Sequence, residues 1–349
     1  MWTDSEIFRQ DLENILQDKA IPWAELEGKR ILVTGATGLI GQTLVSALLF
    51  YGMKTSNPPR VLALVRSLDK AKRVFEKQLK DCGENIEFII GDVCSLPAVE
   101  GRVDYIIHGA SQTASKAFVE KPVETIETAV FGTKSLLELA REKQSLSFVY
   151  LSSMEVYGYP AKGQKVSEEE MGALTTLEVR NCYPLSKQQC ECMCCAYVAE
   201  YGVPAKIIRL TQTFGPGVSY TDGRVFAEFA RCLIEKRDIV LKTKGETSRQ
   251  YLYTADAVRA ILAVLLKGEN GQAYNAANEN SFCSILQMAQ TVAQMGNIRV
   301  KVELQDTRSL GYARTLFMNL NTRKLKNLGW EPNVELPEMF WRMIAEMGK

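Results

Sequence analysis

The stretch from Arg30 to Gly41 constrains this chain more than any other. An apolar run is followed by three glycines at three-residue spacing, Gly35, Gly38 and Gly41. A strand that turns directly into a helix aims free backbone N–H groups and the positive end of the helix dipole at one spot, which suits a pyrophosphate. Gly35 permits the turn, Gly38 keeps side-chain atoms away from the ligand, and Gly41 lets the helix pack against the strand. The spacing is GxxGxxG and not GxGxxG, and a turn without a ligand also needs some of these glycines. Alone, the motif favours a dinucleotide site.

Strands alternate with helices through the first two thirds of the chain. Near-continuous apolar runs predict further strands at 60–65, 86–90, 103–108, 146–151 and 205–210, with helices through Lys80, at 123–143 and at 184–201 between them. Such runs are typical of parallel strands that are buried on both faces. We therefore predict an α/β fold: a doubly wound parallel (Rossmann) sheet with a smaller C-terminal α/β substrate-binding region.

The same pass along the sequence predicts three segments. Residues 1–27 form an N-terminal helical extension, with an amphipathic helix at 4–18 that packs on the body or on a second subunit. Residues 28–215 form the dinucleotide-binding domain, to which segments near 247–277 return. Residues 216–349 are mainly substrate-binding, with helices at 224–236, 256–267 and 285–295 and a strand at 298–304. Ligands of doubly wound folds lie beyond the carboxyl ends of the strands, so the smaller region is expected to close over that edge.

Charge and composition exclude several classes of partner. Among 349 residues, 42 are basic and 41 acidic, so there is no bulk electrostatic case for nucleic acid or an anionic membrane. No apolar run approaches about 20 residues, and the first residues carry scattered acids where a secretory signal has a basic start and an apolar centre. We expect a cytoplasmic protein.

Cysteine and histidine usage argues against a metal. The nine cysteines are odd in number and lack the spaced pairs of a disulfide framework or zinc site. Cys190 and Cys194 would share a helix face, but no histidine is near, so buried apolar side chains are the preferred interpretation. The single histidine, His108, excludes mechanisms that need two.

Tyr183 and Lys187 are the first candidates for chemistry. They are four residues apart and therefore share one face of a helix. An ammonium beside a phenol favours the phenolate and lowers the phenol pKa from ~10 towards the working pH, so that the tyrosine can accept a hydroxyl proton. A solvated lysine beside a half-buried tyrosine is the competing interpretation of these two residues alone.

In combination, the motifs resemble those of a known family. The glycine turn, the HGAS segment at 108–111, Ser153, the Tyr183–Lys187 pair and the RLTQTFGP segment at 209–216 together resemble the extended short-chain dehydrogenase/reductases. More narrowly, the chain resembles the nucleotide-sugar epimerases, dehydratases and decarboxylases of that family. The resemblance covers residues 28 to about 345, including RQYLYTAD at 249–256 and LGW at 328–330.

The resemblance implies a shared opening step on a nucleotide-diphosphate sugar. Tyr183 takes the proton from the sugar hydroxyl, usually at C4, and Ser153 hydrogen-bonds that oxygen. Hydride passes to a nicotinamide held by the glycine turn and Lys187, and the keto-sugar then undergoes epimerisation, loss of water or decarboxylation. The hydride is usually returned, so the cofactor is a retained catalyst.

Carried over residue by residue, the resemblance assigns three groups of site residues. The catalytic group is Ser153, Glu155, Tyr183, Lys187 and Arg249. The cofactor-binding group is Gly35, Thr37, Gly38, Leu39, Ile40, Gly41, Arg66, Asp92, Val93, Ala110, Ser111 and Lys187. Substrate binding falls to Ser111, Gln212, Arg224 and Arg249, and no metal is expected.

The cofactor is expected to be NAD, with NADP left open. Arg66 and Ser67 follow the second strand where NAD-preferring relatives have an acid for the ribose 2′-hydroxyl, and Asp69 comes late for this role. Arg66 would accept a 2′-phosphate. Gln212 stands where relatives have an asparagine that contacts the sugar nucleotide, and it is one methylene longer.

Which branch follows the oxidation depends on residues around the sugar. Dehydratases commonly carry Asp-Glu at the positions of Met154 and Glu155, and Met154 cannot donate a proton. UDP-glucuronate decarboxylases resemble the chain in Glu155, in Arg180-x-Cys182-Tyr183, in the DGRV segment at 222–225 and in Arg249. Decarboxylation is therefore the leading prediction, followed by 4-epimerisation and 4,6-dehydration. Glu155 as a solvent-facing carboxylate and Arg249 as a surface or phosphate-clamping arginine are competing interpretations.

Two other kinds of function stay open, as does the assembly. One is a catalytically silent dinucleotide sensor, which the retention of Ser153, Tyr183 and Lys187 disfavours. The other is a net oxidoreductase that releases its reduced cofactor. We expect a homodimer in which the helices at 123–143 and 184–201 pack against their symmetry mates, because the second helix carries an apolar, cysteine-rich face: Cys190, Cys194, Tyr197 and Val198.

Overall fold

A seven-stranded parallel sheet forms the centre of the larger part of the molecule. The computed structural model describes residues 5–305 and 314–347. The strand order is β11-β7-β5-β4-β1-β2-β3, and every neighbouring pair is parallel. The strands are β1 Arg30–Thr34, β2 Arg60–Val65, β3 Ile86–Ile90, β4 Tyr105–His108, β5 Ser147–Ser153, β7 Ala205–Leu210 and β11 Ala273–Ala276. The order reverses between β1 and β4, so the predicted doubly wound fold is confirmed.

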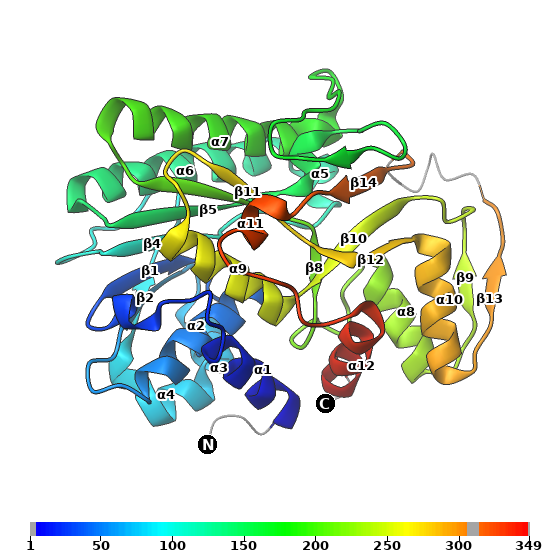
Figure 1. Cartoon of the computed structure of the whole chain (residues 1–349), viewed down its shortest axis with the longest axis horizontal. Coiled ribbons are helices and arrows are strands. Elements are labelled where there is room, and N and C mark those ends of the chain that lie inside the picture. Colours follow the sequence, from blue (N-terminus) through cyan, green and yellow to red (C-terminus); the bar gives the residue numbers. More distant parts are fainter. Residues whose placement is uncertain (1–4, 306–313, 348–349) are drawn as a thin grey trace.

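Helices cover both faces of this sheet (Figure 1). In that view α6 (Pro122–Lys143) and α7 (Cys182–Tyr201) lie above the strands, while α1 (Glu6–Leu16) and α2 (Leu39–Gly52) lie below. Alternate residues of each strand enter separate apolar clusters: Val149 and Ile208 pack with α2 and with α9 (Thr254–Lys267), whereas Phe148 and Ile207 pack with α6 and α7. Because successive side chains of a strand point to opposite faces of the sheet, one apolar core lies on each face.

The single helix predicted through Lys80 is in fact two helices. These are α3 (Leu68–Val74) and α4 (Glu76–Cys82), which meet at Phe75. Phe75 is fully buried and stacks on Phe88 of β3, with ring centroids 6.1 Å apart. The non-helical backbone of Phe75 thus coincides with the burial of its side chain against the sheet.

A second sheet and a small helical layer make up the rest. The sheet has the order β12-β10-β14-β6, with β8 paired to β10, and a separate ribbon joins β13 to β9. Its strands are β6 Lys165–Val166, β8 Gln212–Phe214, β9 Ile239–Leu241, β10 Ser248–Tyr253, β12 Asn278–Ser284, β13 Val300–Val302 and β14 Phe317–Leu320. The helices are α5 Ala117–Glu120, α8 Val225–Ile234, α10 Ile285–Gly296, α11 Arg323–Lys326 and α12 Leu336–Met347.

The chain passes between the two sheets more than once. After β10 it returns through α9 to β11, the edge strand of the large sheet, within the segment near 247–277. Where one domain ends and the next begins stays a prediction. Residues 1–4, 306–313 and 348–349 of the predicted segments lie outside the described residues.

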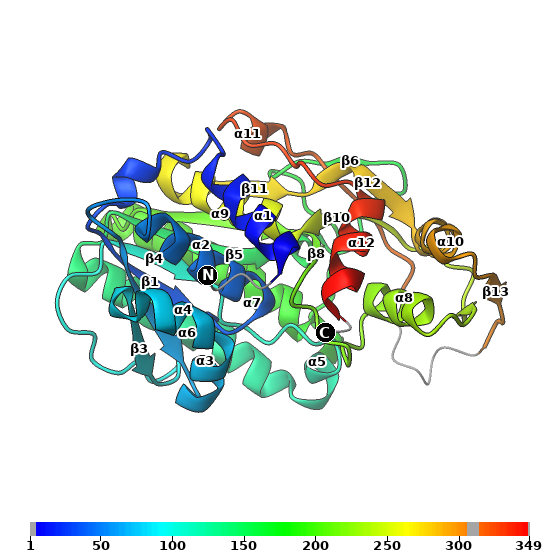
Figure 2. The same cartoon turned by 90° about the horizontal axis from the view of Figure 1, so that it is seen from below.

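The N-terminal helix packs on the body of the same chain (Figure 2), where it contacts α2 and α9. Ser5 caps it by accepting a hydrogen bond from the backbone N–H of Phe8. The buried carboxylate of Asp11 accepts hydrogen bonds from the Tyr253 hydroxyl at 2.6 Å and from Arg342 at 3.1 Å. These bonds connect the extension to β10 and to α12.

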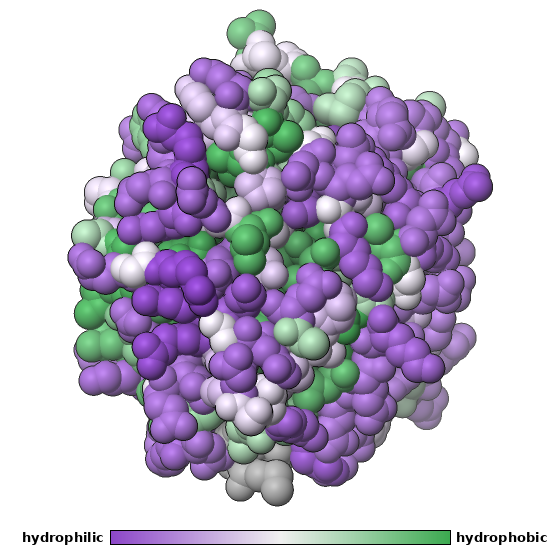
Figure 3. Space-filling model, turned by 60° about the vertical axis from the view of Figure 1, so that its left-hand side comes forward, coloured by the Kyte–Doolittle hydropathy of each residue, from purple (hydrophilic) through white to green (hydrophobic). Residues whose placement is uncertain are grey.

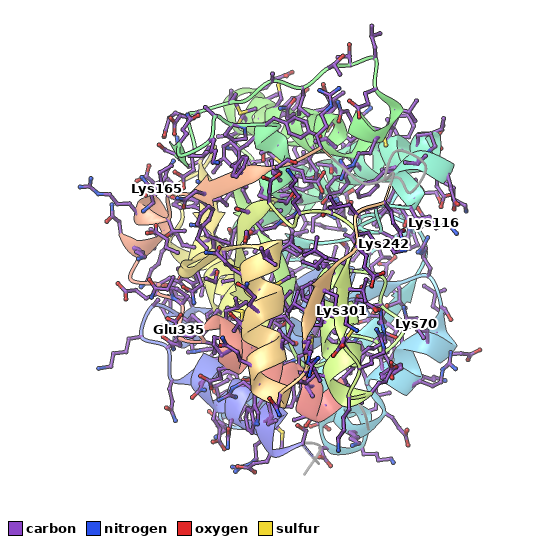
Figure 4. The ribbon with its side chains drawn as sticks, turned by 90° about the vertical axis from the view of Figure 1, so that its right-hand side faces the viewer. Lys70, Lys116, Lys165, Lys242, Lys301 and Glu335 are labelled. Carbon is purple, nitrogen blue, oxygen red and sulfur yellow. The ribbon has the colours of Figure 1, made fainter. Side chains whose placement is uncertain are left out.

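The surface is mostly polar. On the face in Figure 3, hydrophobic residues form several small patches in a largely hydrophilic surface. Figure 4 views the smaller region from the front, with Lys242, Lys301, Lys70 and Lys116 on one side and Lys165 and Glu335 on the other. Within the described residues, no helix combines the length and the apolar character that crossing a membrane requires.

Candidate functional site

The glycine turn after β1 leaves no space for side chains. Gly35 has φ +70°, and a Cβ there would lie 2.8 Å from the backbone carbonyl of Gly109. A Cβ on Gly41 would lie 2.2 Å from the carbonyl oxygen of Gly35. Gly38 caps α2 without a side-chain hydrogen bond, so the N–H groups of the first turn, including those of Leu39 and Ile40, have no capping partner. The turn therefore offers the unpaired backbone donors that a pyrophosphate needs.

His108 fastens this turn to the next strand. Its Nδ1 atom lies 2.8 Å from the Thr34 hydroxyl, and its Nε2 atom lies 3.2 Å from the Thr133 hydroxyl. Thr34 also accepts hydrogen bonds from the backbone N–H groups of Gly109 and Ala110 at 3.1 Å. Burial, together with the charge of Lys187, lowers the pKa of His108 to about 3. The neutral imidazole thus positions the ends of β1 and β4.

The other predicted cofactor residues follow the carboxyl ends of β1, β2, β3 and β4. Thr37 lies in the glycine turn, and the exposed Arg66 follows β2. Asp92 follows β3 and accepts a hydrogen bond from the backbone of Cys94, while Val93 is buried against Gly132 of α6. Ser111 follows β4, and its hydroxyl donates to the carbonyl of Gln112.

Ser67 and Asp69, which follow Arg66, belong to the start of α3. Ser67 is the N-cap of α3 and accepts from the Lys70 N–H, and the exposed Asp69 stands in the first turn of that helix.

Ser153, Tyr183 and Lys187 come together where β5 meets α7. The Ser153 hydroxyl accepts a hydrogen bond from the Glu155 N–H and lies beside the Tyr183 phenol, whose pKa it lowers. Lys187 is buried and donates to the Leu151 carbonyl at 2.7 Å, and its Nζ atom lies 5.8 Å from the centre of the Tyr183 ring. The structure thus places the three residues that we predict to be catalytic next to one another.

The predicted fall of the Tyr183 pKa is wrong for the chain as it stands. Burial raises the pKa of the Tyr183 phenol, and the Glu155 carboxylate raises it further, although Ser153 and Arg180 oppose this. Burial also lowers the pKa of Lys187 to about 8. The physical reason is that the ammonium is directed to the Leu151 carbonyl and not to the phenol oxygen.

Glu155 is paired with Arg180, so the solvent-facing interpretation of this carboxylate fails. Glu155 lies in the short 3-10 helix Met154–Tyr157 and Arg180 in another, Val179–Asn181. The Nη1 atom of Arg180 donates to Glu155 Oε2 at 2.7 Å, and the two side chains are 20% and 26% exposed. A largely shielded ion pair therefore stands beside the tyrosine.

Phe118 of α5 completes this cluster. Its ring stacks on Tyr183 with centroids 4.3 Å apart and an angle of 10° between the rings. The Arg180 guanidinium lies 5.5 Å from the Phe118 ring centre. Phe118 thus fixes the plane of the phenol and contacts the arginine that holds Glu155.

A buried polar network supports the strand ends beneath Ser153. Arg209 of β7 forms an ion pair with Glu191 of α7 at 2.7 Å and donates to the Tyr157 hydroxyl at 2.8 Å. The Ser152 hydroxyl donates to the same Glu191 carboxylate. The network holds β5, β7 and α7 in fixed relation.

Gln212 and Arg249 lie on one face of the second sheet. In the parallel pairing of β8 with β10, Gln212 stands opposite Tyr251, and Arg249 is two residues from Tyr251 on β10. Gln212 Oε1, Arg249 Nε and the Tyr251 hydroxyl are all buried without a hydrogen-bond partner in the described structure. Such orphaned atoms are costly unless a ligand or water completes them. This face is therefore suited to bind polar substrate groups.

Two stacked aromatic rings link Arg224 to β8 of the second sheet. Its guanidinium lies 4.7 Å from the centre of Phe226, which stacks on Phe214, the last residue of β8. The same guanidinium is held by Asp222 at 2.6 Å, which leaves it partly exposed at the N-terminus of α8.

Met154 faces away from this chemistry. It is buried in an apolar cluster with Val156, Met318 and Leu320, and its sulfur accepts a hydrogen bond from Thr211.

The cysteine-rich face of α7 is buried within the subunit, so the reason given for a dimer is wrong. Cys190 and Cys194 are fully buried, and Cys190 donates to the Ala129 carbonyl of α6. The Tyr197 hydroxyl hydrogen-bonds with Glu138 of α6. Only Val198 is partly exposed. Within the described residues, no three His, Cys, Asp or Glu side chains are placed to hold a metal ion.

Phe118, Arg180 and Tyr251 are the site residues absent from our sequence-based assignment. Arg180 stood in the motif around Tyr183 but was given no role. Phe118 has no distinguishing sequence signal, because its contact with Tyr183 joins residues far apart in the chain.

Comparisons with known proteins agree with this geometry. The sequence model of the NAD-dependent epimerase/dehydratase family matches residues 31–277. UDP-glucuronic acid decarboxylase 1 of Xenopus tropicalis is 31% identical over 337 residues, which are 94% of this chain and 75% of that protein. The dTDP-D-glucose 4,6-dehydratase of Bos taurus is 28% identical over 322 residues, 89% of this chain and 86% of that one.

Solved structures share the fold. The UDP-glucose 4-epimerase of Thermotoga maritima superposes with a TM-score of 0.75 at 21% identity, covering 91% of this chain and 98% of that one. A dTDP-glucose 4,6-dehydratase of Streptomyces venezuelae gives a TM-score of 0.74 at 22% identity, with 91% and 96% covered.

Proposed function

The chain belongs to the NAD-dependent epimerase/dehydratase family, and from that premise we propose that it modifies a nucleotide sugar by transient oxidation at C4 with a retained nicotinamide cofactor. When bound, NAD supplies the hydride acceptor for that oxidation. The observation that carries the proposal is the contact set of Ser153, Tyr183 and Lys187 at the carboxyl end of β5. A pure dinucleotide sensor needs no such phenol.

The residues around the glycine turn fit NAD. The turn is a cradle that any Cβ at Gly35 or Gly41 would fill, and the first turn of α2 presents free N–H groups. We assign the pyrophosphate to this turn and to Thr37, Leu39 and Ile40, and the adenosine ribose to Arg66. The rest of the cofactor would contact Asp92, Val93, Ala110 and Ser111. Lys187 would contact the nicotinamide ribose.

Tyr183 acts as the base for the C4 hydroxyl. The Ser153 hydroxyl, which lies beside the phenol, orients the sugar oxygen. To stabilise negative charge on the phenol, the Lys187 ammonium, 5.8 Å from the ring centre, would turn from the Leu151 carbonyl towards the phenol oxygen when cofactor and substrate bind. The Phe118 stack keeps the phenol in one plane throughout.

Among the branches, decarboxylation of a UDP-glucuronate-type substrate is the reaction that the charges favour. Arg180 neutralises Glu155, so the site does not repel a second carboxylate on the sugar. Arg249 forms no ion pair with a described carboxylate, and its Nε is buried and unpaired, so it would bind the substrate carboxylate. Gln212 and Arg224 would hold the nucleotide and its phosphates, with Ser111 at the sugar.

The alternatives are 4-epimerisation and then 4,6-dehydration. Epimerisation needs only the oxidation and a keto-sugar that can rotate within the site, so that hydride returns to its other face. Dehydration is the weaker alternative, because the buried Met154 leaves no acid beside Glu155 to protonate the departing hydroxyl.

Incubation with UDP-, dTDP-, CDP- and GDP-sugars, followed by mass analysis, tests the proposal. Loss of carbon dioxide from UDP-glucuronate is the expected result. Loss of water or an unchanged mass with altered retention would assign the reaction to an alternative branch. No turnover of any sugar nucleotide would overturn it. Tightly bound NAD after purification supports a retained cofactor, whereas stoichiometric release of NADH indicates a net oxidoreductase.

We also propose a homodimer that uses α6, one of the two helices first predicted at the interface, together with α5 in place of the buried face of α7. Val119 of α5 and Val123, Ile126 and Phe131 of α6 are 43–65% exposed. A row of large apolar side chains on an outer helix is typical of an interface.

The nine cysteines are all unpaired, which supports a reducing compartment such as the cytosol.

A further inference from the structure

A basic hollow lies at the end of the large sheet where β1 and β2 begin. It has a volume of about 500 Å³. Its lining consists of Gly28, Arg30, Asn57, Pro58, Arg60, Asn85 and Arg102. Arg30 begins β1 and Thr34 ends it, so the hollow is separated from the glycine turn by the length of the strand, roughly 13 Å at ~3.3 Å per residue.

The backbone around the hollow is shaped to the side chains that line it. A Cβ on Gly101, where φ is +73°, would lie 2.5 Å from Arg30 Nη1, so this guanidinium packs directly against the glycine. A Cβ on Gly28, where φ is +65°, would lie 2.7 Å from the Asn57 amide nitrogen. Both glycines therefore make room for a polar side chain at the hollow.

The side chains that line the hollow offer more hydrogen-bond donors than acceptors. The Nε atom of Arg30 is buried and unpaired, and this arginine has only a distant carboxylate, Glu87, at 3.7 Å. Among the described residues, no side chain pairs with the Arg60 guanidinium or with the amides of Asn57 and Asn85.

The Asp104 carboxylate, which contacts two of the lining arginines from outside the hollow, already has its partners. Asp104 accepts from the Arg30 backbone N–H at 2.8 Å and binds Arg102 at 2.9 Å. Arg102 also donates to the Gly28 carbonyl at 3.2 Å. The hollow thus keeps unpaired cationic donors that the protein itself does not satisfy.

The three arginines stand at the starts of three neighbouring strands. Arg30 and Arg60 are register partners on β1 and β2, and Arg102 leads into β4 on the other side of β1. Neighbouring strands are about 4.8 Å apart, so the arginines span a width of about 10 Å. Guanidinium groups bind phosphate oxygens through paired N–H donors. A row of this width matches a chain of phosphates better than a single anion.

We propose that this hollow is a second anion site, distinct from the dinucleotide site, which binds an oligophosphate chain. Arg60 and Arg30 bind the phosphate oxygens, Arg102 borders them, and the Asn57 and Asn85 amides complete the lining. The assignment does not depend on the reaction proposed above.

Calorimetric titration of the full chain with inorganic tripolyphosphate tests the site, first alone and then in saturating NAD. We expect a binding event that keeps its affinity in saturating NAD, where the glycine turn is filled, and that is at least tenfold weaker in Arg60→Gln and weaker still in Arg60→Glu. The control is Arg73→Gln, an exposed arginine of α3 in the same part of the molecule, which should bind like the parent. ATP in a second titration distinguishes the source: tighter binding than tripolyphosphate assigns a nucleotide, and equal or weaker binding an inorganic chain, and both support the site.

Three results would overturn the proposal. They are no measurable binding, displacement of tripolyphosphate by NAD, and equal affinities of Arg60→Gln and the parent protein. Because Arg60 is exposed and has no described partner, the variants should keep the melting temperature of the parent.

Discussion

The guanidinium of Arg180 lies 2.7 Å from the carboxylate of Glu155, and the same arginine lies over the ring of Phe118, which stacks on Tyr183. The pair therefore connects Glu155, which we place beside the sugar, to Tyr183, the base that we propose for the reaction. Arg180 is a positioning residue in this account, because it acts through Glu155.

Removing either partner of this pair should have the same effect as removing both. We expect Glu155→Gln and Arg180→Gln each to lower kcat about 10²-fold, the scale of one acid–base contribution. The double variant should be no slower than the worse single one, because the arginine acts through the glutamate. Steady-state kinetics measures this, with Arg237→Gln, a surface arginine paired with Glu235, as the control. Losses that multiply in the double variant would show independent roles.

His108 should remain neutral far below its usual titration range. Its pKa of about 3 lies below the ordinary ~6.5, so between these values the unfolded chain binds a proton that the folded chain does not. The stability it contributes is complete above pH 6.5 and is lost as the pH falls, by about 2 kcal/mol at pH 5.

Because His108 is the single histidine, NMR of its ring protons reports it without ambiguity. The ring signals should not shift between pH 8 and 5. A titration midpoint near 6.5 would contradict the buried Thr34–His108–Thr133 arrangement.

Discrimination between NAD and NADP should be loose. Arg66 follows β2 with no carboxylate beside it, so the group that would repel a 2′-phosphate is missing. We expect NAD to bind better by less than about a hundredfold, or roughly 2.7 kcal/mol. Titration of cofactor-stripped protein with both dinucleotides measures the ratio, and Arg66→Glu should increase it. A preference above a thousandfold would mean that another residue, such as Asp69, rejects the phosphate.

The apolar row on α5 and α6 should hold two subunits together. Sedimentation at micromolar concentration should give a dimer, and Ile126→Glu, which buries a charge at that interface, should give a monomer. As a control, Leu304→Glu alters a more exposed apolar residue outside this row and should leave the dimer intact. A monomeric parent protein would refute the assembly.

The sequence predicts what depends on local pattern. The bounds of β2 and β7 follow directly from their apolar runs, and the glycine turn follows from its spacing. The cysteines of α7 show the limit: their spacing identifies a buried face, but not that α6 of the same chain covers it.

Local sequence patterns do not predict contacts between segments that are far apart in the chain. The Glu155–Arg180 pair joins two short 3-10 helices on separate loops, and the Phe118–Tyr183 stack joins α5 to α7. Likewise, the phenol pKa depends on burial and on where the Lys187 ammonium points, and neither is encoded in the four-residue spacing.

Transfer of deuterium from C4 of a labelled substrate tests the central claim most directly. UDP-glucuronate carrying deuterium at C4 is incubated with the protein and its bound NAD, and the product is examined by mass spectrometry and NMR. Hydride return predicts decarboxylated product that keeps the deuterium at C4, without accumulation of free NADH. Tyr183→Phe, which preserves the stack on Phe118, should bind NAD as before and form no product. Product that has lost its deuterium, or full activity of Tyr183→Phe, would contradict the account.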